Sequence, residues 1–302
     1  MLAIVIPYYK FTFFEATLQS LANQTDKRFK VYISNDASPE GPELLLEKYE
    51  GQFDFVYHRF EHNLGSISLV QQWNRCIDFI HDEEWLMILG DDDELGEHCI
   101  ADFYGNLAPI ITAKSNVVRY ATRINDVVQL KQSDLYTHPQ LEKATDFFFR
   151  RISNQTRSSL SEYIFTRASF EKYGFVDYDL AWHSDDRAWL EFSENSPIYT
   201  INTSSVSFRL SGENISRGDY KIKEKQLVSF TFFKFVISNH FHKFRNNQQL
   251  YLLRYYEQLV YTNKKVTFSF WFTNFWLFLR SLNFMESIKF TRRLLIHLKK
   301  DE

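Results

Sequence analysis

Short apolar runs alternate with amphipathic stretches along the first 110 residues of the chain. The runs Leu2–Ile6, Lys30–Ser34 and Phe53–His58 have the length and composition of buried strands. The amphipathic stretches between them, Phe13–Asn23 and about Pro42–Tyr49, have the character of crossover helices. A chain that alternates strand, helix and strand forms a mostly parallel sheet flanked by helices. The pattern therefore predicts a Rossmann-like α/β fold.

The next two elements lead to the most acidic turn of the chain. A third helix is indicated by six apolar residues at three- and four-residue spacings, which share one face: Leu69, Val70, Trp73, Cys76, Ile77 and Ile80. The apolar strand Trp85–Leu89 follows, and after Gly90 come Asp91, Asp92 and Asp93. Ligands of open parallel sheets bind beyond the carboxyl ends of the strands. That edge should hold the three aspartates, together with the acidic residue that follows the second strand.

The alternation weakens beyond residue 110, and we expect an irregular second half there. Strands are predicted at Asn116–Ala121, Glu162–Phe165 and Ile198–Asn202. From about Lys221 the sequence becomes helical and densely aromatic, which places a domain boundary near Gly218. The predicted division is an α/β domain at 1–218, with halves 1–110 and 111–218, and a helical extension at 219–302.

Composition and cysteine usage limit the classes of protein to which the chain can belong. The 302 residues are 44% hydrophobic, enough to fill a substantial core. The two cysteines, Cys76 and Cys99, belong to no closely spaced motif, so we expect no disulfide framework and a reducing, cytoplasmic location. The start Met1–Pro7 has neither a basic segment nor a small-residue cleavage site, so we interpret it as a strand and not as a signal peptide.

Charge is distributed unevenly along the chain. From Lys221 to the end there are 15 Lys or Arg against 5 Asp or Glu, whereas residues 1–220 carry 20 against 33. A basic, aromatic-rich tail indicates an anionic surface as its partner, either a membrane face or the acidic body of the protein itself. No feature of the sequence indicates nucleic acid as a partner.

The aspartate triplet is the strongest chemical signal in the sequence. Asp91, Asp92 and Asp93 repel one another unless a cation or hydrogen-bond donors neutralise them. Mg²⁺ or Mn²⁺ would be held by one or two of these carboxylates together with the phosphates of a ligand. The alternative is a solvated acidic turn that caps a helix at about Glu94–Asp102.

A second acidic position, Asp36, lies in the segment Ser34–Ser38 after the second strand. An acidic side chain there can accept hydrogen bonds from a nucleobase or a ribose. The same residue types also form ordinary turns, so this segment by itself does not distinguish a nucleotide site from a turn.

Several segments together resemble, in order, those of the family 2 glycosyltransferases of GT-A fold, over roughly residues 1–217. These segments are Ile4–Tyr9 (opening strand), Leu18–Gln24 (first helix), Asn35–Ser38 (the family's Asp-Asp-Gly-Ser), Asn63–Gly65 with Asn74 (its Asn-x-Gly and following Asn) and Leu89–Asp93 (its metal-binding Asp-x-Asp). Two positions depart from the family pattern, since Asn35 and Gly90 stand where the family often has aspartates. Which carboxylate of the triplet contacts a metal therefore stays open.

The resemblance implies an inverting, metal-dependent transferase of the bacterial surface-polysaccharide type. It would use Mn²⁺ or Mg²⁺ and a nucleotide-diphosphate sugar, by default a UDP-sugar, with a glycan or a lipid-linked glycan as acceptor. It also implies that Pro7, Tyr9, Asp36 and Asn63 line the nucleotide pocket. Asp91 and Asp93 would bracket the metal and the ribose, with Asp92 as a competing ligand.

A third constellation lies at Trp182–Leu190, where Asp185 and Asp186 precede a helix. The pair is similar to the family's Glu-Asp acceptor-site motif, which implies that one carboxylate takes the proton of the acceptor hydroxyl. Asp186 is the expected base and Asp185 the alternative, because one of two such neighbours commonly caps the helix. His183 beside them is interpreted as a polar surface residue of a turn, with a metal ligand as the alternative.

A basic segment, Ser207–Arg217, resembles the family's Arg-x-His loop, which closes over the donor diphosphate. Ser211 or Gly212 stands where the histidine would be. Arg209 or Arg217 could stabilise the charge of the leaving diphosphate, and simple solvation of these arginines is the alternative.

The aromatic tail has two interpretations that stay open. Between Lys265 and Arg280 lie 14 uncharged residues, fewer than the roughly 20 that a transmembrane helix needs. A helix lying in the membrane interface suits an aromatic face bounded by basic residues, and the protein would then be peripheral on the inner face of the membrane. Alternatively, the aromatic residues pack against the α/β domain or a second subunit of a homodimer.

Two other functions compete with sugar transfer. A sugar-phosphate nucleotidyltransferase usually has a glycine-rich, basic phosphate loop after the first strand, and Pro7–Phe11 contains no glycine. A non-catalytic scaffold attached to a membrane would not need both acidic clusters. A transferase is therefore the favoured function.

Overall fold

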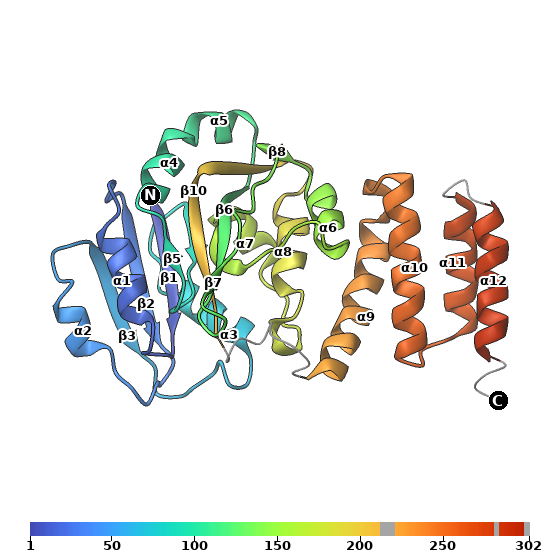
Figure 1. Ribbon diagram of the computed structural model, residues 1–302, viewed down its shortest axis with the longest axis horizontal. Coiled ribbons are helices and arrows are strands. Elements are labelled where there is room, and N and C mark those ends of the chain that lie inside the picture. The colour runs from blue at the N-terminus through green and yellow to red at the C-terminus, as the bar shows by residue number, and fades with distance from the viewer. Residues whose placement is uncertain (212–220, 281–283, 299–302) are drawn as a thin grey trace. The chain divides into compact units, whose positions relative to one another are not determined.

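The computed structural model describes residues 1–211, 221–280 and 284–298 (Figure 1). The chain divides into two compact units, Met1–Tyr220 and Lys221–Glu302. The first unit is α/β and the second is helical. The predicted boundary at Gly218 lies outside the described residues, as do Gly212 and Arg217.

The first half of the α/β unit is a parallel sheet, as predicted. Its strands are β1 (Leu2–Tyr8), β2 (Phe29–Asn35), β3 (Asp54–Arg59) and β4 (Trp85–Ile88), in the spatial order β3-β2-β1-β4. The helices of this half are α1 (Phe14–Ala22), α2 (Glu43–Glu47) and α3 (Leu69–Ile77). The inner strands β1 and β4 are buried along nearly their whole length, which explains their continuous apolar sequences. The predicted Rossmann-like sheet is confirmed.

The register of the parallel strands brings their carboxyl ends to one edge. Tyr8 pairs with Asn35, and Val5 pairs with Ile88. The residues that follow these strands therefore meet at the same edge of the sheet. This register determines the position of the candidate site.

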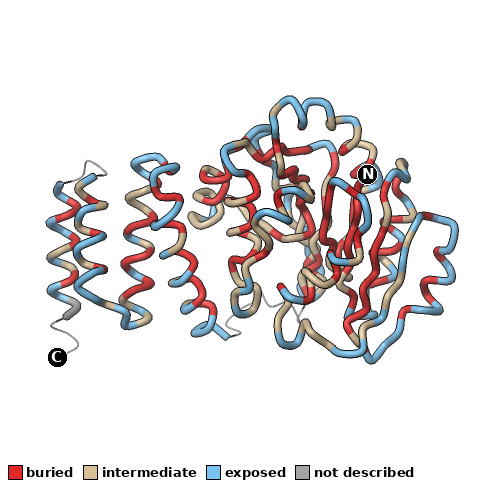
Figure 2. The backbone as a smooth tube through the Cα atoms, turned by 180° about the vertical axis from the view of Figure 1, so that it is seen from behind, coloured by how far each residue is buried: buried red, intermediate tan, exposed pale blue. Residues whose placement is uncertain are grey.

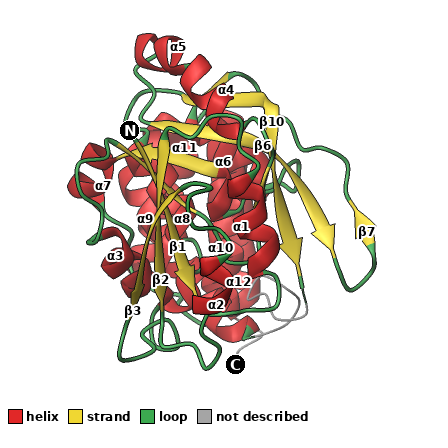
Figure 3. Ribbon diagram, turned by 90° about the vertical axis from the view of Figure 1, so that its left-hand side faces the viewer, coloured by secondary structure: helices red, strands yellow, loops and turns green. Residues whose placement is uncertain are grey.

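The second half extends the same ten-stranded sheet with mixed strand directions (Figure 3). Strand β9 (Tyr163–Thr166) is antiparallel to β4 and to β6 (Val117–Asp126), and β10 (Ile198–Leu210) is parallel to β6. The remaining strands are β5 (Glu94–Leu95), β7 (Lys131–Gln132) and β8 (Leu141–Glu142). The helices are α4 (Cys99–Gly105), α5 (Leu107–Thr112), α6 (Ala144–Ile152), α7 (Arg167–Tyr173) and α8 (Ser184–Phe192), with 3₁₀ turns η1 (Leu160–Glu162) and η2 (Asp179–Ala181).

Strand β10 runs eight residues past the predicted end at Asn202, and this prediction was wrong in extent. The pairing with β6 shifts register between Ile201 and Ser205. The polar residues Thr203 and Ser204 of this bulge both donate hydrogen bonds to Asp102, so the strand continues through a polar interruption. The extension carries β10 to the same edge as the aspartate triplet.

Aromatic packing fixes helix α8 against the sheet. The ring of Trp189 stacks on Tyr163 of β9 at a centroid distance of 4.1 Å and an interplanar angle of 18°. Phe165 and Phe175 contact the same indole, and both are buried. Large buried rings give a rigid core, so the first turn of α8 is held at a defined place.

The second unit contains α9 (Ile222–Asn239), η3 (Phe241–Lys243), α10 (Asn246–Thr262), α11 (Phe268–Arg280) and α12 (Phe284–Leu298). Figure 2 shows buried and exposed turns alternating along these helices. Ion pairs join α10 to α12, since Arg254 bonds Glu286 at 2.7 Å and Arg293 bonds Glu257 at 2.7 Å. Within the described parts of the chain, every helix is too short or too polar to cross a membrane.

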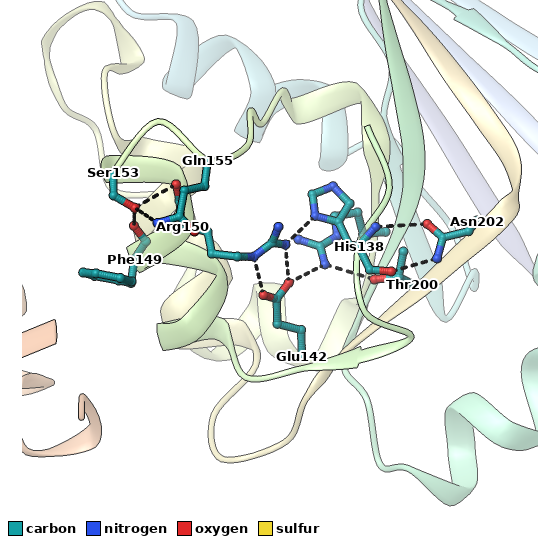
Figure 4. Close-up of polar contacts among 9 residues, drawn as sticks. His138, Glu142, Phe149, Arg150, Ser153, Gln155, Thr200 and Asn202 are labelled. Carbon is teal, nitrogen blue, oxygen red and sulfur yellow. Dashed lines mark hydrogen bonds and ion pairs between the residues drawn. The ribbon is translucent and has the colours of Figure 1, made fainter. Parts of the chain in front are cut away.

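A buried polar network joins β6, β8, α6 and β10 (Figure 4). The guanidinium of Arg119 is fully buried and donates to Glu142 and to Thr200, both at 3.0 Å. Arg150 of α6 donates to the same Glu142 carboxylate at 2.7 and 2.8 Å and contacts His138 Nδ1. Burial and the neighbouring arginines lower the pKa of His138 to about 2, so the imidazole is neutral. One carboxylate therefore neutralises two arginines and ties α6 to the sheet.

Removal of this carboxylate should destabilise the fold strongly. Glu142→Ala leaves the Arg119 charge buried without its partner, and we expect the free energy of unfolding to fall by about 3–5 kcal/mol. Urea denaturation followed by circular dichroism measures the change. The matched control is Glu194→Ala, which removes an exposed partner of Lys172 and should cost less than about 1 kcal/mol. Equal losses for the two variants would contradict a structural role for the network.

Candidate active site

A cavity of about 760 Å³ lies at the carboxyl edge of the strands. It brings together most of the predicted site residues: Pro7, Tyr9, Asp36, Asn63, Asp91, Asp92, Asp93 and Asp185. Asp186 and Arg209, which were also predicted to act here, are absent from its lining. Residues from β1, β4, η1, η2 and β10 meet at this cavity although they are far apart in the sequence.

Asp36 is held in a cradle made by the turn before α3. Its carboxylate accepts hydrogen bonds from the backbone N–H groups of Leu64 (2.7 Å) and Gly65 (2.8 Å), and it pairs with Arg75. Gly65 is required by the close approach, because an added Cβ would lie 2.6 Å from the carboxylate oxygen. The segment Asn63–Gly65 therefore fixes the orientation of Asp36 at the wall of the cavity.

Asp91 ties the aspartate turn to the loop after β1. Its Oδ2 accepts hydrogen bonds from the backbone N–H groups of Tyr9 and Lys10, each at 2.7 Å. Burial and the charge of Asp92 raise the pKa of Asp91 to about 6, against the effect of those two donors. Asp91 thus positions the Tyr9 backbone beside the cavity.

Asp93 ties the same turn to the second half of the sheet. Its carboxylate accepts hydrogen bonds from Ser161 Oγ at 2.5 Å and from the backbone N–H of Arg209 at 2.8 Å. Burial, followed by the charge of Asp92, raises the pKa of Asp93 to about 7. Burial is therefore the main cause of the raised pKa values of Asp91 and Asp93, and the negative charge of Asp92 adds to it.

Three adjacent carboxylates at the wall of one cavity suit a divalent cation. Where the structure describes the chain, no group of three His, Cys, Asp or Glu side chains forms a ready-made metal cage. Mg²⁺ and Mn²⁺ sites that use substrate phosphates need only one or two protein carboxylates. Asp91 and Asp93 are both engaged by backbone donors, and Asp92 also lines the cavity. The residues present fit a metal that takes its other ligands from a bound diphosphate.

The glycine at position 90 has a steric reason. An added Cβ would lie 3.0 Å from an Asp93 oxygen and 3.2 Å from an Asp92 oxygen. A side chain there would have to displace these carboxylates. Gly90 departs from the family pattern, which often has an aspartate at this position. The carboxylates of Asp92 and Asp93 lie too close to leave room for that side chain.

The two aspartates of α8 have different surroundings. Asp186 is buried and bonds Arg151 at 2.8 Å and His183 Nδ1 at 2.6 Å, whereas Asp185 lines the cavity. The expectation that His183 lies at the surface was wrong, because its ring packs inward against Asp186 and is 7% exposed. Burial alone would raise the pKa of Asp186, but the Arg151 guanidinium and the His183 hydrogen bond hold it below its usual value. Burial and the neighbouring Asp186 charge raise the pKa of Asp185 to about 7. The geometry favours Asp185, the alternative base, over Asp186.

Arg209 contacts the aspartate turn instead of lining the cavity. Its Nε donates to the Asp92 carbonyl at 2.9 Å, it pairs with Glu94, and its guanidinium lies 4.4 Å from the ring centroid of Phe13. Among the described residues, the cations that line the cavity are Lys10, Arg151 and Arg157. The predicted role of Arg209 in binding the diphosphate stays a prediction, and its side chain lies behind the aspartate turn.

Several lining residues were not predicted from the sequence. They include Lys10, Trp73, Arg151, Arg157, Ser159, Ser161 and Trp182. Arg75, which pairs with Asp36, was also not predicted, although it directly follows Asn74, one of the residues that carry the family resemblance. Arg151 and Arg157 had no local signal, because they reach the cavity only through the packing of α6 and the loop before η1.

The backbone leading into α8 is unusual. Leu180, Ala181 and His183 all have positive φ values, of 62°, 52° and 67°. Non-glycine residues in this region cost free energy and tend to cluster at functional sites. All three residues line the cavity, together with Trp182 between them. The strained turn presents Trp182 and the Asp185 side chain to the same space.

Comparison with known proteins gives matches in sequence and in structure. A family model described as Glycosyl transferase family 2 matches residues 3–177. Residues 1–349 of S. aureus TarS in complex with UDP-GlcNAc superpose with a TM-score of 0.64 at 14% identity, over 86% of this chain and 72% of that one. The same TarS segment in complex with UDP gives 0.55 at 16% identity, over 86% and 80%.

A third solved structure is GalNAc-T7 with UDP, GalNAc and Mn²⁺. Its TM-score is 0.52 at 12% identity, over 76% of this chain and 47% of that one. No curated protein sequence matches the chain. At these identities the structural matches establish the fold.

The tightness of the cradle around Asp36 can be tested by adding one methyl group at Gly65. Gly65→Ala places a Cβ against the carboxylate, and we expect a loss of about 1–3 kcal/mol in the free energy of unfolding. Urea denaturation measures it. Gly105→Ala is the control, since nothing lies within 4 Å of its added Cβ, and it should leave stability unchanged or slightly raised. An unaffected Gly65→Ala protein would show that the cradle is not tight.

Proposed function

Because the chain belongs to glycosyl transferase family 2 and is a glycosyltransferase of GT-A fold, we propose that it transfers a sugar from UDP to an acceptor hydroxyl with inversion. The observation that carries this proposal is the single cavity that joins Asp36, Asn63, the aspartate triplet and Asp185. Nucleotide recognition, diphosphate binding and proton removal can all occur within it.

The donor half of the cavity suits a nucleoside diphosphate. Pro7, Tyr9, Asp36 and Asn63 form one wall at the end of β1 and β2. The TarS structures and the GalNAc-T7 structure contain UDP or UDP-GlcNAc, which supports a uridine nucleotide here. Lys10 and Arg157 line the same cavity and would offset the charge of the leaving diphosphate.

A divalent cation, Mn²⁺ or Mg²⁺, would be held at the aspartate turn. Asp92 is the carboxylate that we assign to it, because it lines the cavity between Asp91 and Asp93, whose own carboxylates hold the loop after β1 and the turn η1 in place. When bound, such an ion acts as a Lewis acid that neutralises charge on the diphosphate. The presence of Mn²⁺ in the GalNAc-T7 structure supports this choice of cation.

Asp185 is the base in this mechanism. It takes the proton of the acceptor hydroxyl while the hydroxyl oxygen forms a bond to the anomeric carbon. The bond from that carbon to the diphosphate oxygen breaks, and the electron pair leaves with UDP. Asp186 does not touch the acceptor but is bonded to Arg151 and His183, so it orients the first turn of α8.

The acceptor that we propose is a glycan or a lipid-linked glycan in polysaccharide biosynthesis, used at the cytoplasmic side of a membrane. The strained turn with Trp182 supports a sugar ring as acceptor, because an indole face packs well against the apolar face of a pyranose. This turn lies next to Asp185, where the acceptor hydroxyl must come.

The metal assignment can be tested by binding alone. Mn²⁺ should raise the affinity for UDP by a factor in the usual coupling range of roughly 5 to 150, and Asp92→Asn should abolish that gain. Isothermal titration calorimetry with and without Mn²⁺ measures it. Asp54→Asn, at an exposed surface position, is the control and should keep the gain. A gain retained in Asp92→Asn but lost in Asp91→Asn or Asp93→Asn would reassign the ligand.

The two aspartates of α8 can be separated by activity and pH. Asp185→Asn should lower kcat by about 10²–10⁴. The base works deprotonated and its pKa is raised to about 7, so kcat/KM should be lost as pH falls through that value. Asp186→Asn removes the neighbouring charge that raises this pKa, so activity should persist and its acidic limb should move to lower pH.

Initial rates of UDP release between pH 5 and pH 9 measure both effects, provided that circular dichroism shows folded variants. A folded Asp186→Asn variant that is inactive at every pH, beside an active Asp185→Asn variant, would make Asp186 the base.

A further inference from the structure

Helix α11 carries an aromatic stripe that is exposed. Phe268, Phe272 and Trp276 follow one another at four-residue spacing, so they share one side of the helix. Their exposed fractions are 78%, 50% and 50%. The other side of the helix buries Phe270 and Phe278, which both contact Phe290 of α12. The exposed rings are therefore additional to the core of the helical unit.

Helix α12 repeats the arrangement. Met285, Ile288 and Leu295 are 60%, 48% and 56% exposed, and their spacing places them on one side. Glu286 and Phe290 lie on the other side and are buried. Figure 1 shows α11 and α12 side by side within the helical unit. Each of these two neighbouring helices thus has a row of solvent-exposed apolar side chains. Exposed apolar surfaces of this kind mark interaction sites.

The charges on these two helices are of one sign. Their exposed charged residues, among those that the structure describes, are Arg280, Lys289 and Arg292. The acidic residue of α12, Glu286, is 4% exposed and is bonded to Arg254 and Lys289. Lys264 and Lys265, just before α11, are also exposed. Cations therefore lie beside the apolar stripes. The described parts of the two helices carry no exposed carboxylate.

We propose that α11 and α12 bind the surface of an anionic lipid bilayer, with the aromatic stripe in the interface between headgroups and acyl chains. The 13 residues of α11 span about 20 Å, too short to cross a hydrocarbon core of about 30 Å, so the helices lie on the surface. Aromatic rings and cations on an amphipathic helix are the combination that interfacial binding requires. The cations add electrostatic attraction to anionic headgroups.

Charge complementarity distinguishes this occupant from a second copy of the chain. In a symmetric dimer the same patch faces a second copy of itself, so the cations Arg280 and Arg292 of both copies would lie in one interface. The described part of these helices offers no exposed carboxylate to neutralise them. An anionic membrane supplies the missing negative charge. The inference goes beyond the proposed sugar transfer and does not depend on it.

The test is sedimentation of the full chain with phospholipid vesicles. We expect binding to vesicles that contain phosphatidylglycerol and much weaker binding to phosphatidylcholine alone. Phe272→Ser with Trp276→Ser should reduce the binding by about tenfold or more, because both lose apolar contact with the lipid. The matched control is Leu44→Ser with Ile111→Ser, which changes two exposed apolar residues of the α/β unit and should leave binding unchanged.

The electrostatic part is tested separately. Arg280→Gln with Arg292→Gln should weaken binding to the anionic vesicles by roughly 30-fold, from about 1 kcal/mol for each cation. Quenching of tryptophan fluorescence by brominated lipids should be smaller in Trp276→Phe than in the unchanged chain.

Three results would overturn the proposal. One is equal binding to anionic and neutral vesicles, and another is binding that none of the stripe variants reduces. The third is a chain that does not bind vesicles and that analytical ultracentrifugation shows to be a dimer. If Phe272→Ser with Trp276→Ser converts that dimer to a monomer, the face belongs to a second copy of the chain.

Discussion

The mutual repulsion of carboxylates at one turn is the constraint on which the site depends. Asp91, Asp92 and Asp93 follow a buried strand, and donors from both halves of the sheet reach Asp91 and Asp93. Asp91 binds the loop after β1, and Asp93 binds η1 and β10. The same contacts that offset part of the charge join the two halves around the cavity. The three carboxylates thus stay together at the wall of the cavity, where we propose that a divalent cation binds.

The carboxylates of the site divide into those that shape it and those that face its contents. Asp36, Asp91 and Asp93 accept backbone hydrogen bonds, so they fix loops in place. Asp186 does the same for α8 through Arg151 and His183. Burial and the negative charge of Asp186 raise the pKa of Asp185 toward the range in which a base works near neutral pH. Similar side chains thereby acquire different tasks.

The helical unit follows a different physical rule. Its interior is closed by aromatic contacts, and the buried carboxylates Glu257 and Glu286 pair with the partly exposed Arg293 and Arg254. Basic residues outnumber acidic ones, and several, such as Arg280 and Arg292, are exposed. An excess of cations beside exposed aromatic rings is the consequence, and it gives the unit a surface whose character differs from that of the acidic α/β unit.

Apolar periodicity and short motifs are local properties, so the amino-acid order indicates the parallel strands, the sheet edge that carries the acidic residues, and the family. The parallel strands of the first half were therefore predictable, and so was the position of Asp36 and the triplet at one edge. Tertiary packing places Asp185, and not Asp186, at the cavity, because α6 brings Arg151 to Asp186 from 35 positions away. It likewise decided that Arg209 braces the triplet, and that β10 continues through a polar bulge whose hydrogen bonds come from Asp102. These outcomes depend on distant partners, which no local pattern records.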